Sequence, residues 1–327
     1  MNSNPEILLS ICIPTYNRAF MLRECLDSVI ESIKDFESEI EIIISDNASM
    51  DGTDKMVRAY LISFPFITYY RNEENIGAER NVRSLTKRVA GKYIWILGDD
   101  DKVTKNAIGI IMQYIKLNYD LVINNYSVWS KDFSKLIKNF FFRIQSEETF
   151  SNPNDILSKF GIHLGYVSSL VFKKSCFIKR PDKEYDFFLD YGYPQVYAAY
   201  YGLFPKCNVI YNPIPVVCNR GNNSGGYDWY KYNVIGMSLI LNKLKYIGYT
   251  LKAVNKAQCR IIKEFVVHDI LVKIRDNKST NGLFVLMFPY YKKYFIFWGV
   301  CVPLLLIPKA PISFIYKFIK SRVVKIK

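Results

Sequence analysis

The sequence predicts an α/β protein in which helices flank a mostly parallel sheet. Over the first 125 residues, short β-rich runs alternate with helical patterns, and a polar cluster follows each of four strands. Strict alternation of this kind is typical of βαβ units, whose strands run parallel. Sheets built this way bind ligands at the carboxyl ends of their strands. We therefore expect the functional site to be formed by the residues that come directly after the strands.

The spacing of apolar residues places the elements of this first part. Short runs of Val, Ile, Leu and aromatic residues predict strands at Leu8–Ile13, Glu41–Ser45, Ile67–Arg71, Tyr93–Leu97 and Leu121–Asn124. Apolar residues three and four positions apart predict the intervening helices, at Met21–Ile33, Thr53–Ser63, Ala78–Val89 and Lys105–Leu117.

The second part of the chain has a weaker pattern. Periodicity is poor between Tyr126 and Phe160, which predicts an insertion or loop region. After it we expect a strand at Tyr166–Phe172, a helix at Pro194–Tyr201, and a strand at Asn208–Cys218 that Pro213 and Pro215 break. A segment rich in Gly and Asn follows, and then helical patterns at Tyr230–Tyr246 and Leu251–Arg275.

The charge of the chain is unevenly distributed. Lys and Arg number 44 against 30 Asp and Glu, a formal net charge of +14. No acidic residue follows Asp276, whereas nine basic residues do, so most of the excess belongs to the C-terminal tail. Net charge by itself leaves nucleic acid, a membrane surface and acidic small molecules open as partners.

The tail combines basic and apolar residues at helical spacing. From Pro311 onward, one helical face would be apolar, formed by Ile312, Ile315, Tyr316, Ile319, Val323 and Ile326. A basic amphipathic helix suits an anionic membrane surface better than nucleic acid, although a helix docked on the protein is an alternative. The uncharged run before it, Tyr294–Pro308, is shorter than the roughly 20 residues that a spanning helix needs. We expect peripheral membrane association and no nucleic-acid partner.

Cysteine usage and the start of the chain bear on location. The seven cysteines are scattered, mostly flanked by apolar residues, and include no C-x-x-C pair, a pattern that predicts reduced thiols. The first ten residues lack the basic and long apolar regions of a signal peptide. We expect a cytoplasmic protein on the inner face of the cell membrane.

Four polar clusters follow the first four strands. They are PTYNR from Pro14, SDNASMDGT from Ser45, NEENIGAERN from Asn72 and GDDD from Gly98. Tyr16 offers a stacking surface, and Arg18 offers a fork that matches phosphate. The three adjacent carboxylates of Asp99, Asp100 and Asp101 need a cation, and their oxygens suit Mg²⁺ or Mn²⁺.

These clusters predict a nucleotide site. A divalent ion held by one or two carboxylates commonly binds a diphosphate, and together with Arg80 it would stabilise a leaving nucleoside diphosphate. The sequence contains neither a P-loop nor a Gly-x-Gly-x-x-Gly turn. Taken singly, Asp46 could be an Asx turn or helix cap and the acidic run a solvated turn. Their shared position on one edge of the sheet favours a site.

Together these segments resemble a known family. SICIPTYNRAFMLRECLDSV, EIEIIISDNASMDGT, ENIGAERN and GKYIWILGDDD stand in the order and spacing of the family 2 glycosyltransferases with the Rossmann-like GT-A fold. This resemblance covers about residues 7–125. HLGYVSSLVFKK, YGYPQV and VCNRGNNS are similar to the abequosyltransferase-like enzymes of bacterial O-antigen and capsule synthesis, which extends the match to about Ser224.

The resemblance implies a role for each matched residue. The donor nucleotide would be held by residues of the first two clusters, with Asp46 on the base, namely Pro14, Thr15, Tyr16, Arg18, Asp46 and Asn47. Residues of the third cluster would lie along the diphosphate or the sugar, namely Asn75, Gly77 and Arg80.

The metal motif departs from the family pattern. The Asp-x-Asp of the family falls on Gly98, Asp99 and Asp100, so its first carboxylate is missing. The resemblance then implies Asp100 as the best metal ligand with Asp101 beside it. Asp99 or Asp101 would take over the ribose contact that the first Asp usually makes.

Inversion of the sugar requires a base for the acceptor hydroxyl, and the family places it after the metal motif. Asp190 is the first candidate and Asp186 the second, although Asp190 could instead be a helix N-cap or a loop residue. His163 and His268 lack a metal-ligand pattern and are expected to be structural. The segment Arg220–Gly226 could be an acceptor lid or an ordinary loop.

The sequence thus predicts an inverting, metal-dependent glycosyltransferase that uses a nucleotide-sugar donor. Its acceptor would be a lipid-linked, polyprenyl-diphosphate-bound precursor of a bacterial surface polysaccharide. A polyprenyl-phosphate glycosyltransferase and an inactive membrane-surface protein that binds sugar nucleotides are the alternatives. We expect a GT-A domain over residues 1–225, with a nucleotide-sugar half (1–125) and an acceptor half (126–225), and a helical, membrane-associating region over residues 226–327.

Overall fold

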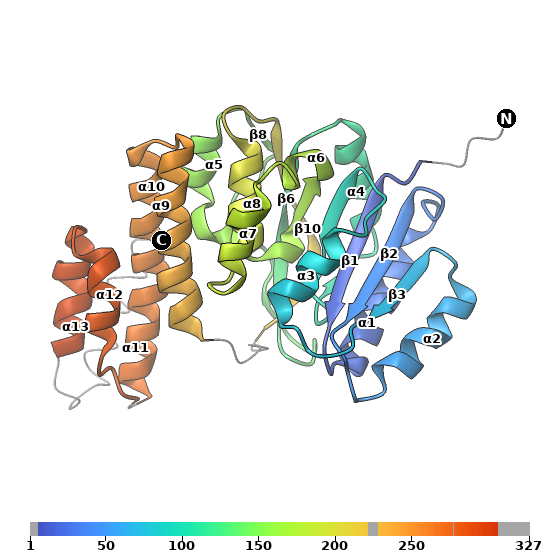
Figure 1. Cartoon of the computed structure of the whole chain (residues 1–327), viewed down its shortest axis with the longest axis horizontal. Coiled ribbons are helices and arrows are strands. Elements are labelled where there is room, and N and C mark those ends of the chain that lie inside the picture. Colours follow the sequence, from blue (N-terminus) through green and yellow to red (C-terminus); the bar gives the residue numbers. More distant parts are fainter. Residues whose placement is uncertain (1–5, 222–227, 277, 307–327) are drawn as a thin grey trace. The chain divides into compact units, whose positions relative to one another are not determined.

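The computed structural model of the chain describes residues 6–221, 228–276 and 278–306. The chain forms two compact units (Figure 1). The first unit comprises residues 1–156 and 163–227, and the second comprises residues 157–162 and 228–327. The domain boundary expected near residue 225 and the amphipathic helix expected after Pro311 lie outside the described residues.

The first unit is built on one sheet, which has ten strands within the described residues. Their order is β3-β2-β1-β4-β9-β6-β10-β5, with β7 paired to β6 and β8 paired to β10. The strands are β1 (Leu9–Thr15), β2 (Ile40–Asp46), β3 (Ile67–Arg71), β4 (Tyr93–Ile96), β5 (Lys102–Val103), β6 (Leu121–Trp129), β7 (Leu136–Lys138), β8 (Glu148–Phe150), β9 (Leu170–Lys173) and β10 (Val209–Arg220).

Strand directions in this sheet agree with the predicted class. Strands β3, β2, β1 and β4 run parallel to one another, and β10 runs parallel to β6. Only the inserted β9 runs antiparallel to both β4 and β6 among the central strands. The carboxyl ends of β1, β2, β3 and β4 therefore meet along one edge, where the expected polar clusters begin.

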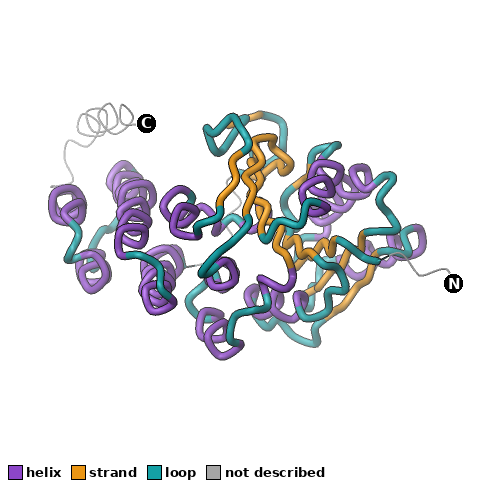
Figure 2. Tube along the Cα trace, turned by 90° about the horizontal axis from the view of Figure 1, so that it is seen from above, coloured by secondary structure: helices purple, strands orange, loops and turns teal. Residues whose placement is uncertain are grey.

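Helices lie on both sides of these strands (Figure 2). Those that begin in the first unit are α1 (Ala19–Ile33), α2 (Thr53–Ser63), α3 (Ala78–Thr86), α4 (Ala107–Lys116), α5 (Pro153–Lys159), α6 (Lys174–Phe177), α7 (Asp182–Leu189) and α8 (Pro194–Leu203). Helix α1 buries Leu22, Cys25, Leu26 and Val29, three or four residues apart, as an amphipathic helix on a sheet must. Helices α6 and α7 had no counterpart among the expected elements.

Two expected strands differ from the structure. The strand expected at Tyr166–Phe172 begins only at Leu170, because Val167–Ser169 forms a 3₁₀ turn. Strand β10 passes through Pro213 and Pro215 without ending, and its register with β6 shifts at Asn212/Pro215 and Pro215/Val217. Proline has no N–H for the ladder, so the strand forms irregular pairs there instead of breaking.

The second unit is helical in its described residues. It contains α9 (Met237–Ile247), α10 (Leu251–Arg260), α11 (Val267–Arg275), α12 (Leu283–Tyr291) and α13 (Val302–Leu306), with π-helical turns at Lys231–Gly236, Ile261–Val266 and Phe297–Cys301. The helix expected at Leu251–Arg275 is confirmed as α10, a π turn and α11 in succession. In the described part of the chain, no helix is both long and apolar enough to cross a membrane.

Candidate active site

The edge formed by the ends of β1, β2 and β3 brings the first clusters together. Thr15 pairs with Asp46 across β1 and β2, and Asp46 pairs with Arg71 across β2 and β3. Strand β4 ends beside β1 and leads into the acidic loop Gly98–Asp101. Parallel strand order thus places residues separated by up to about ninety positions on one edge, as the sequence predicted.

Asp99 lies at the centre of this edge. Its Oδ2 accepts a hydrogen bond from Thr15 Oγ1 at 2.8 Å, and its Oδ1 pairs with Arg18 Nη1 at 2.9 Å. The same Arg18 nitrogen lies 3.5 Å from Asp100 Oδ2. Burial raises the pKa of Asp99 to about 6, although the positive charge of Arg18 opposes the rise. Thr15 and Arg18 are therefore placed to position the acidic loop.

The carboxylate oxygens of Asp101 face hydrogen-bond donors of the protein and are not available to a metal. Its Oδ2 accepts hydrogen bonds from the hydroxyls of Tyr166 and Ser168, each at 2.7 Å. Its Oδ1 accepts from Asn219 Nδ2 and from the Arg220 backbone N–H, each at 3.2 Å. Burial, and then the negative charge of Asp100, raise the pKa of Asp101 to about 7. Four donors occupy its lone pairs, so the expected second metal ligand serves here as an anchor for the loop.

Arg220 fixes the acidic loop from the other side. Its Nε donates to the Asp100 carbonyl at 2.8 Å, and its Nη2 pairs with Glu24 Oε2 at 2.6 Å. Its Nη1 donates to the Lys131 carbonyl at 2.6 Å, and the whole residue is 5% exposed. These contacts hold Arg220 inside the first unit, whereas residues 222–226 of the segment expected to be a lid or a loop lie outside the described residues.

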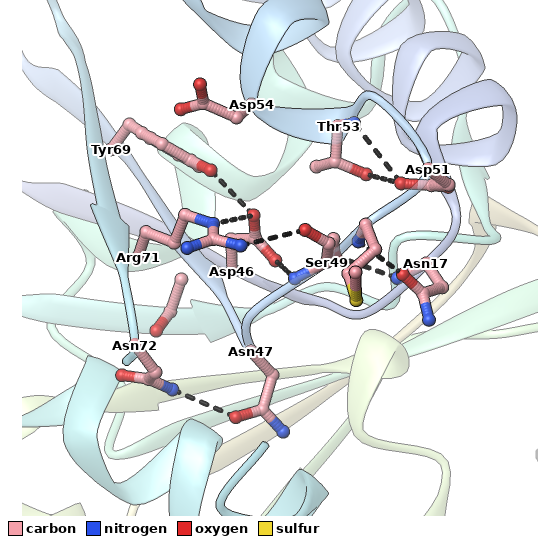
Figure 3. Close-up of polar contacts among 12 residues, drawn as sticks. Asn17, Asp46, Asn47, Ser49, Asp51, Thr53, Asp54, Tyr69, Arg71 and Asn72 are labelled. Atoms are coloured by element: carbon pink, nitrogen blue, oxygen red, sulfur yellow. Dashed lines mark hydrogen bonds and ion pairs between the residues drawn. The ribbon is translucent and has the colours of Figure 1, made fainter. Parts of the chain in front are cut away.

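Asp46 is enclosed at the end of β2 (Figure 3). Its Oδ2 accepts a hydrogen bond from Tyr69 Oη at 2.6 Å and lies 3.7 Å from Arg71 Nε, and its Oδ1 accepts from the Ser49 N–H at 2.9 Å. The side chain has no exposed surface, because the end of β3 covers it. The bond from the Ser49 N–H makes the Asx turn that one interpretation of Asp46 expected, while Arg71 reaches the surface beside it.

A depression of about 340 Å³ opens beside this cluster. Its lining consists of Ser49, Met50, Gly52, Asp54, Arg58 and Arg71. This volume lies within the range of small-molecule sites, and the lining is mostly polar. A ligand in the depression would meet Arg71 before Asp46. Arg71, Ser49 and Tyr69 were not singled out by the sequence patterns, although Arg71 follows the same rule of a polar residue at a strand end.

Asn47 and Asn75 form the support of the next loop. Asn47 Oδ1 accepts hydrogen bonds from Asn72 Nδ2 and the Ile76 N–H, each at 3.0 Å. Asn47 Nδ2 donates to Asn75 Oδ1 at 2.6 Å, which in turn accepts from the Gly77 N–H at 3.0 Å. Gly77 has φ +86° and leads directly into α3, a backbone conformation that favours glycine. These residues shape the N-terminal end of α3.

The remaining donor-side residues are more accessible. Pro14 continues β1 and is partly exposed, and the Tyr16 ring is 43% exposed, as a stacking surface must be. Asn17 connects this turn to the next one, because its N–H donates to Ser49 Oγ at 2.8 Å and its Oδ1 accepts from the Met50 N–H at 2.7 Å.

Ion pairs connect α3 to α7. Arg80 Nη2 lies 2.8 Å from Asp190 Oδ1 at the C-terminal end of α7, and both side chains are at least half exposed. Arg83, one turn further along α3, pairs with Asp186 and lies 3.5 Å from Asp182 Oδ1. The structure thus joins Arg80 and the first candidate base, which stand 110 positions apart in the sequence. Asp190 is the C-cap residue of α7, so the interpretation of this residue as a helix N-cap is wrong.

The residues present fit a divalent cation with few protein ligands. Within the described residues, no group of three or more His, Cys, Asp or Glu side chains forms a ready metal cage. Asp100 is partly exposed beside the buried Asp99 and Asp101, so the loop carries more negative charge than Arg18 balances locally. A cation bound by one carboxylate and by the phosphates of a nucleotide suits this arrangement, and Mg²⁺ binds in this manner.

Of the cysteines, Cys25 of α1 reaches this site, where its Sγ donates to the Gly98 carbonyl at 3.7 Å. His163 packs edge-to-face against Phe141 and Phe142, with ring centroids 5.3 and 5.8 Å apart, which supports the structural role expected for it. All seven cysteines are free thiols, as the scattered pattern predicted.

The sheet order and the polar edge define the class of protein. A mostly parallel sheet with a depression of about 340 Å³ after β2, an acidic loop after β4 and an antiparallel β9 between β4 and β6 is a GT-A-like fold. Solved structures share it: S. aureus TarS 1-349 in complex with UDP has a TM-score of 0.59 and 16% identity, over 86% of this chain and 75% of that one. PcManGT, a mannosyltransferase of Pyrobaculum calidifontis in complex with GDP-Man and Mn²⁺, has a TM-score of 0.54 and 15% identity, over 98% and 87% of the two chains.

Sequence comparison identifies the family. The profile described as glycosyl transferase family 2 matches residues 10–172. Abequosyltransferase RfbV of Salmonella typhimurium is 34% identical over 233 residues, or 66% of this chain and 68% of that protein. The GalNAc(5)-diNAcBac-PP-undecaprenol beta-1,3-glucosyltransferase of Campylobacter jejuni is 28% identical over 169 residues, or 51% and 52% of the two chains. The chain belongs to glycosyltransferase family 2, and it is a glycosyltransferase.

Proposed function

We propose that this glycosyltransferase transfers a sugar, with inversion and with the help of a divalent metal, from a nucleoside-diphosphate sugar to a lipid-linked precursor of a bacterial surface polysaccharide. The observation that carries the proposal is the single edge on which the Arg71 depression, the Thr15–Arg18 turn and the acidic loop lie together. The identity to an abequosyltransferase over two thirds of the chain supports a role in O-antigen or capsule synthesis.

The donor nucleotide would extend along this edge. The base would enter the depression beside Arg71, with Asp46 holding Arg71 in place from behind, and Tyr16 would offer its exposed ring from the turn after β1. Asn47, Asn75 and Gly77 would form the floor beneath the diphosphate at the start of α3, where backbone N–H groups favour anions. In this assignment Asp46 does not contact the nucleobase directly. It supports Arg71, the residue that would make this contact.

Mg²⁺ or Mn²⁺ would be held by Asp100 and by the phosphates of the donor. A bound metal would supply charge stabilisation for the departing nucleoside diphosphate. The chain itself would hold the loop still, through Arg18 and Thr15 on Asp99 and through four donors on Asp101. The Mn²⁺ complex of the structurally similar mannosyltransferase supports this cofactor.

Asp190 would accept the proton of the attacking hydroxyl. It stands at the end of α7 with most of its side chain exposed, and Arg80 reaches it from α3. In the transfer, the acceptor oxygen would form a bond to the anomeric carbon while the bond to the diphosphate oxygen breaks, and the proton would pass to the carboxylate. Asp186 remains the second candidate, since both carboxylates pair with an arginine of α3 but the Asp186 side chain is 47% exposed against 62% for Asp190.

The acceptor would be linked to a polyprenyl diphosphate and met at the inner face of the cell membrane. The name of the Campylobacter relative describes an acceptor bound to undecaprenol through a diphosphate. The basic tail after Asp276 supports a cytoplasmic enzyme that stays close to an anionic lipid surface.

A panel of nucleotide sugars, with and without chelator, tests the donor and the metal together. We expect nucleoside diphosphate release with one donor and loss of it in chelator. Asp100→Asn should lower turnover by about 100-fold or more, because the metal ligand is lost at the site of charge development. Asp35→Asn, at an exposed position after α1, is the control. Equal turnover by the Asp100→Asn variant and the unmodified protein would contradict the metal role.

Replacement of the acidic residues of α7 one at a time tests the base. Asp190→Asn should lower kcat by about 100-fold with little change in the KM of the donor. Asp182→Asn is a matched control, because Asp182 also faces an arginine of α3. A larger loss in Asp186→Asn than in Asp190→Asn would move the base to Asp186.

A further inference from the structure

Helix α12 and the turn after it present an apolar surface to solvent. Phe295 is 89% exposed, Val285 is 74% exposed and Trp298 is 46% exposed. Together with Phe284, Lys292 and Lys293, which are also exposed, these residues are named here the α12 face. Large apolar side chains seldom cluster on the solvent-exposed surface of a protein that has no apolar partner.

Ring contacts join Phe284, Phe288 and Trp298 into one cluster on the α12 face. Phe284 lies 5.4 Å from Phe288 and 6.3 Å from Trp298 between ring centroids, and Phe288 lies 6.0 Å from Trp298. Lys292 Nζ stands 5.6 Å from the centroid of the Phe288 ring. Phe295 lies three residues before Trp298, and its ring stands 3.4 Å from the position that a Cβ at Gly299, the neighbour of Trp298, would occupy.

The polar groups of this face are arranged for an apolar partner. The indole N–H of Trp298 donates to the Lys292 carbonyl at 2.6 Å, so the ring can enter an apolar environment without an unsatisfied donor. Lys292 and Lys293 lie at its border, where long stems can keep their charges in water while the rings are buried.

The charge of the face is positive throughout. Residues 278–306 include Lys278, Lys292 and Lys293 and no acidic residue. Lys245 of α9 lies beside Lys293, and the pKa of Lys245 is lowered by burial and by that neighbouring charge. Two amines held together in this way favour an anionic group between them.

We propose that the α12 face docks on an anionic bilayer, with its aromatic rings in the headgroup region and its lysines on lipid phosphates. Exposed Trp and Phe bordered by Lys are typical of proteins that lie in the membrane interface. A two-fold contact between copies of the chain fits less well, since it would bring the lysines of one face against the same lysines of the other. The inference rests on the proposed function in one respect, because a lipid-linked acceptor would lie at the membrane on which the α12 face docks. The residues of this face precede the basic tail in the chain.

Vesicle co-sedimentation of the full chain tests the apolar part of the face. Phosphatidylcholine vesicles with phosphatidylglycerol should bind the protein, and Phe295→Glu or Val285→Glu should lower the partition coefficient by about 10-fold or more. Ile62→Glu is the matched control, because Ile62 is an 88% exposed apolar residue on α2. Equal loss, or no loss, in the Phe295→Glu and Ile62→Glu variants overturns the proposal.

Charge reversal separates lipid from other partners. The double variant Lys292→Glu with Lys293→Glu should weaken binding to the mixed vesicles by about 10-fold and leave the weak binding to pure phosphatidylcholine unchanged. The control double variant, Lys55→Glu with Lys87→Glu, should bind the mixed vesicles as the unmodified protein does. Light scattering provides a further test: a dimer that Phe295→Glu converts to monomers, with vesicle binding unchanged, would assign the face to a second copy and overturn the proposal.

Donor turnover distinguishes this proposal from the proposed function. Phe295→Glu should retain transfer to a detergent-solubilised acceptor, because Phe295 lies in the second unit and is not among the residues proposed to bind the donor. Transfer absent in the unmodified chain together with intact vesicle binding would contradict the function and leave the docking face standing. Vesicle binding that persists in Phe295→Glu but disappears when the tail lysines are reversed would overturn the docking face alone.

Discussion

The two buried aspartate clusters at the sheet edge are stabilised in different ways. Asp46 takes its partners from the end of its own strand and the next one, Ser49, Tyr69 and Arg71. Asp101 takes its four hydrogen bonds from residues between 65 and 119 positions away in the sequence. The first cluster forms once β2 and β3 pair, whereas the second requires β9 and β10 to be in place.

This difference indicates where the chain tolerates change. A local cluster with its own arginine can be altered at the surface without disturbing the sheet. The acidic loop concentrates three carboxylates, and its order depends on Arg18, Arg220 and the hydroxyls that reach it from separate elements. Ligand binding and stability should therefore respond differently to substitutions in the two clusters.

The largest expected effect is on the support of the acidic loop. Arg220→Ala removes a buried guanidinium from Glu24 and from the Asp100 carbonyl, and should lower the free energy of unfolding by about 2–4 kcal/mol. Urea unfolding measures this decrease in the free energy of unfolding. The control is Arg58→Ala, whose exposed i,i+4 pair with Asp54 should contribute about 0.5 kcal/mol or less. Equal losses in both variants would mean that the loop does not depend on its distant partners.

A binding effect is expected in the local cluster. Arg71→Ala should raise the dissociation constant of the donor nucleotide by about 10- to 100-fold, the equivalent of one charge-assisted hydrogen bond. Calorimetric titration with the nucleoside diphosphate of the accepted donor measures it. Arg88→Ala, at an exposed arginine that stacks on Tyr70, should leave the affinity unchanged. Unchanged affinity in Arg71→Ala would remove the depression from the donor site.

The smallest expected effect is a pH dependence of stability in chelator. Asp99 and Asp101 have folded-state pKa values of about 6 and about 7, above the ordinary value near 4, so the folded state holds protons that the unfolded state has released. Their contribution is fully present below the unfolded pKa and is lost as pH rises through the folded values. The free energy of unfolding should fall by about 1–3 kcal/mol between pH 5 and about pH 8.

Asp99→Asn sharpens the same measurement. Its amide keeps an acceptor for Arg18, and the Thr15 hydroxyl can turn to accept a hydrogen bond from the amide nitrogen. The variant should therefore lose part of the pH slope while remaining folded. A pH profile that coincides with that of the unmodified protein would show that Asp99 does not carry a raised pKa.

The first half of the fold was predictable because its signals are local. Strands β2 and β3 and helices α1, α2 and α4 agree with the apolar spacing to within a few residues, and Ile67–Arg71 and Thr53–Ser63 coincide with β3 and α2. The region after Tyr126 was predicted poorly. Strand β6 continues to Trp129, and α7 is a short helix that packs through contacts to α8 and α3 and carries little periodicity of its own.

The sequence predicted where the polar residues of the candidate site would lie. Residues after a strand can be recognised in the sequence, so Thr15, Arg18, Asp46 and Asp99 lie where the pattern placed them. The roles of Asp101 and Arg220 could not be inferred, because each depends on which side chains fold back from β9, β10 and α1.

The sequence by itself determined the alternation of strands and helices, the edge on which polar residues gather, and the family. Those properties follow from periodicity and from residues adjacent in the chain. Only the tertiary structure decided that Asp101 is saturated by four donors, that Arg80 meets Asp190, and that Phe295 and Trp298 face solvent. Hydrogen-bond partners and exposure depend on which surfaces pack together, and packing joins residues that the sequence keeps far apart.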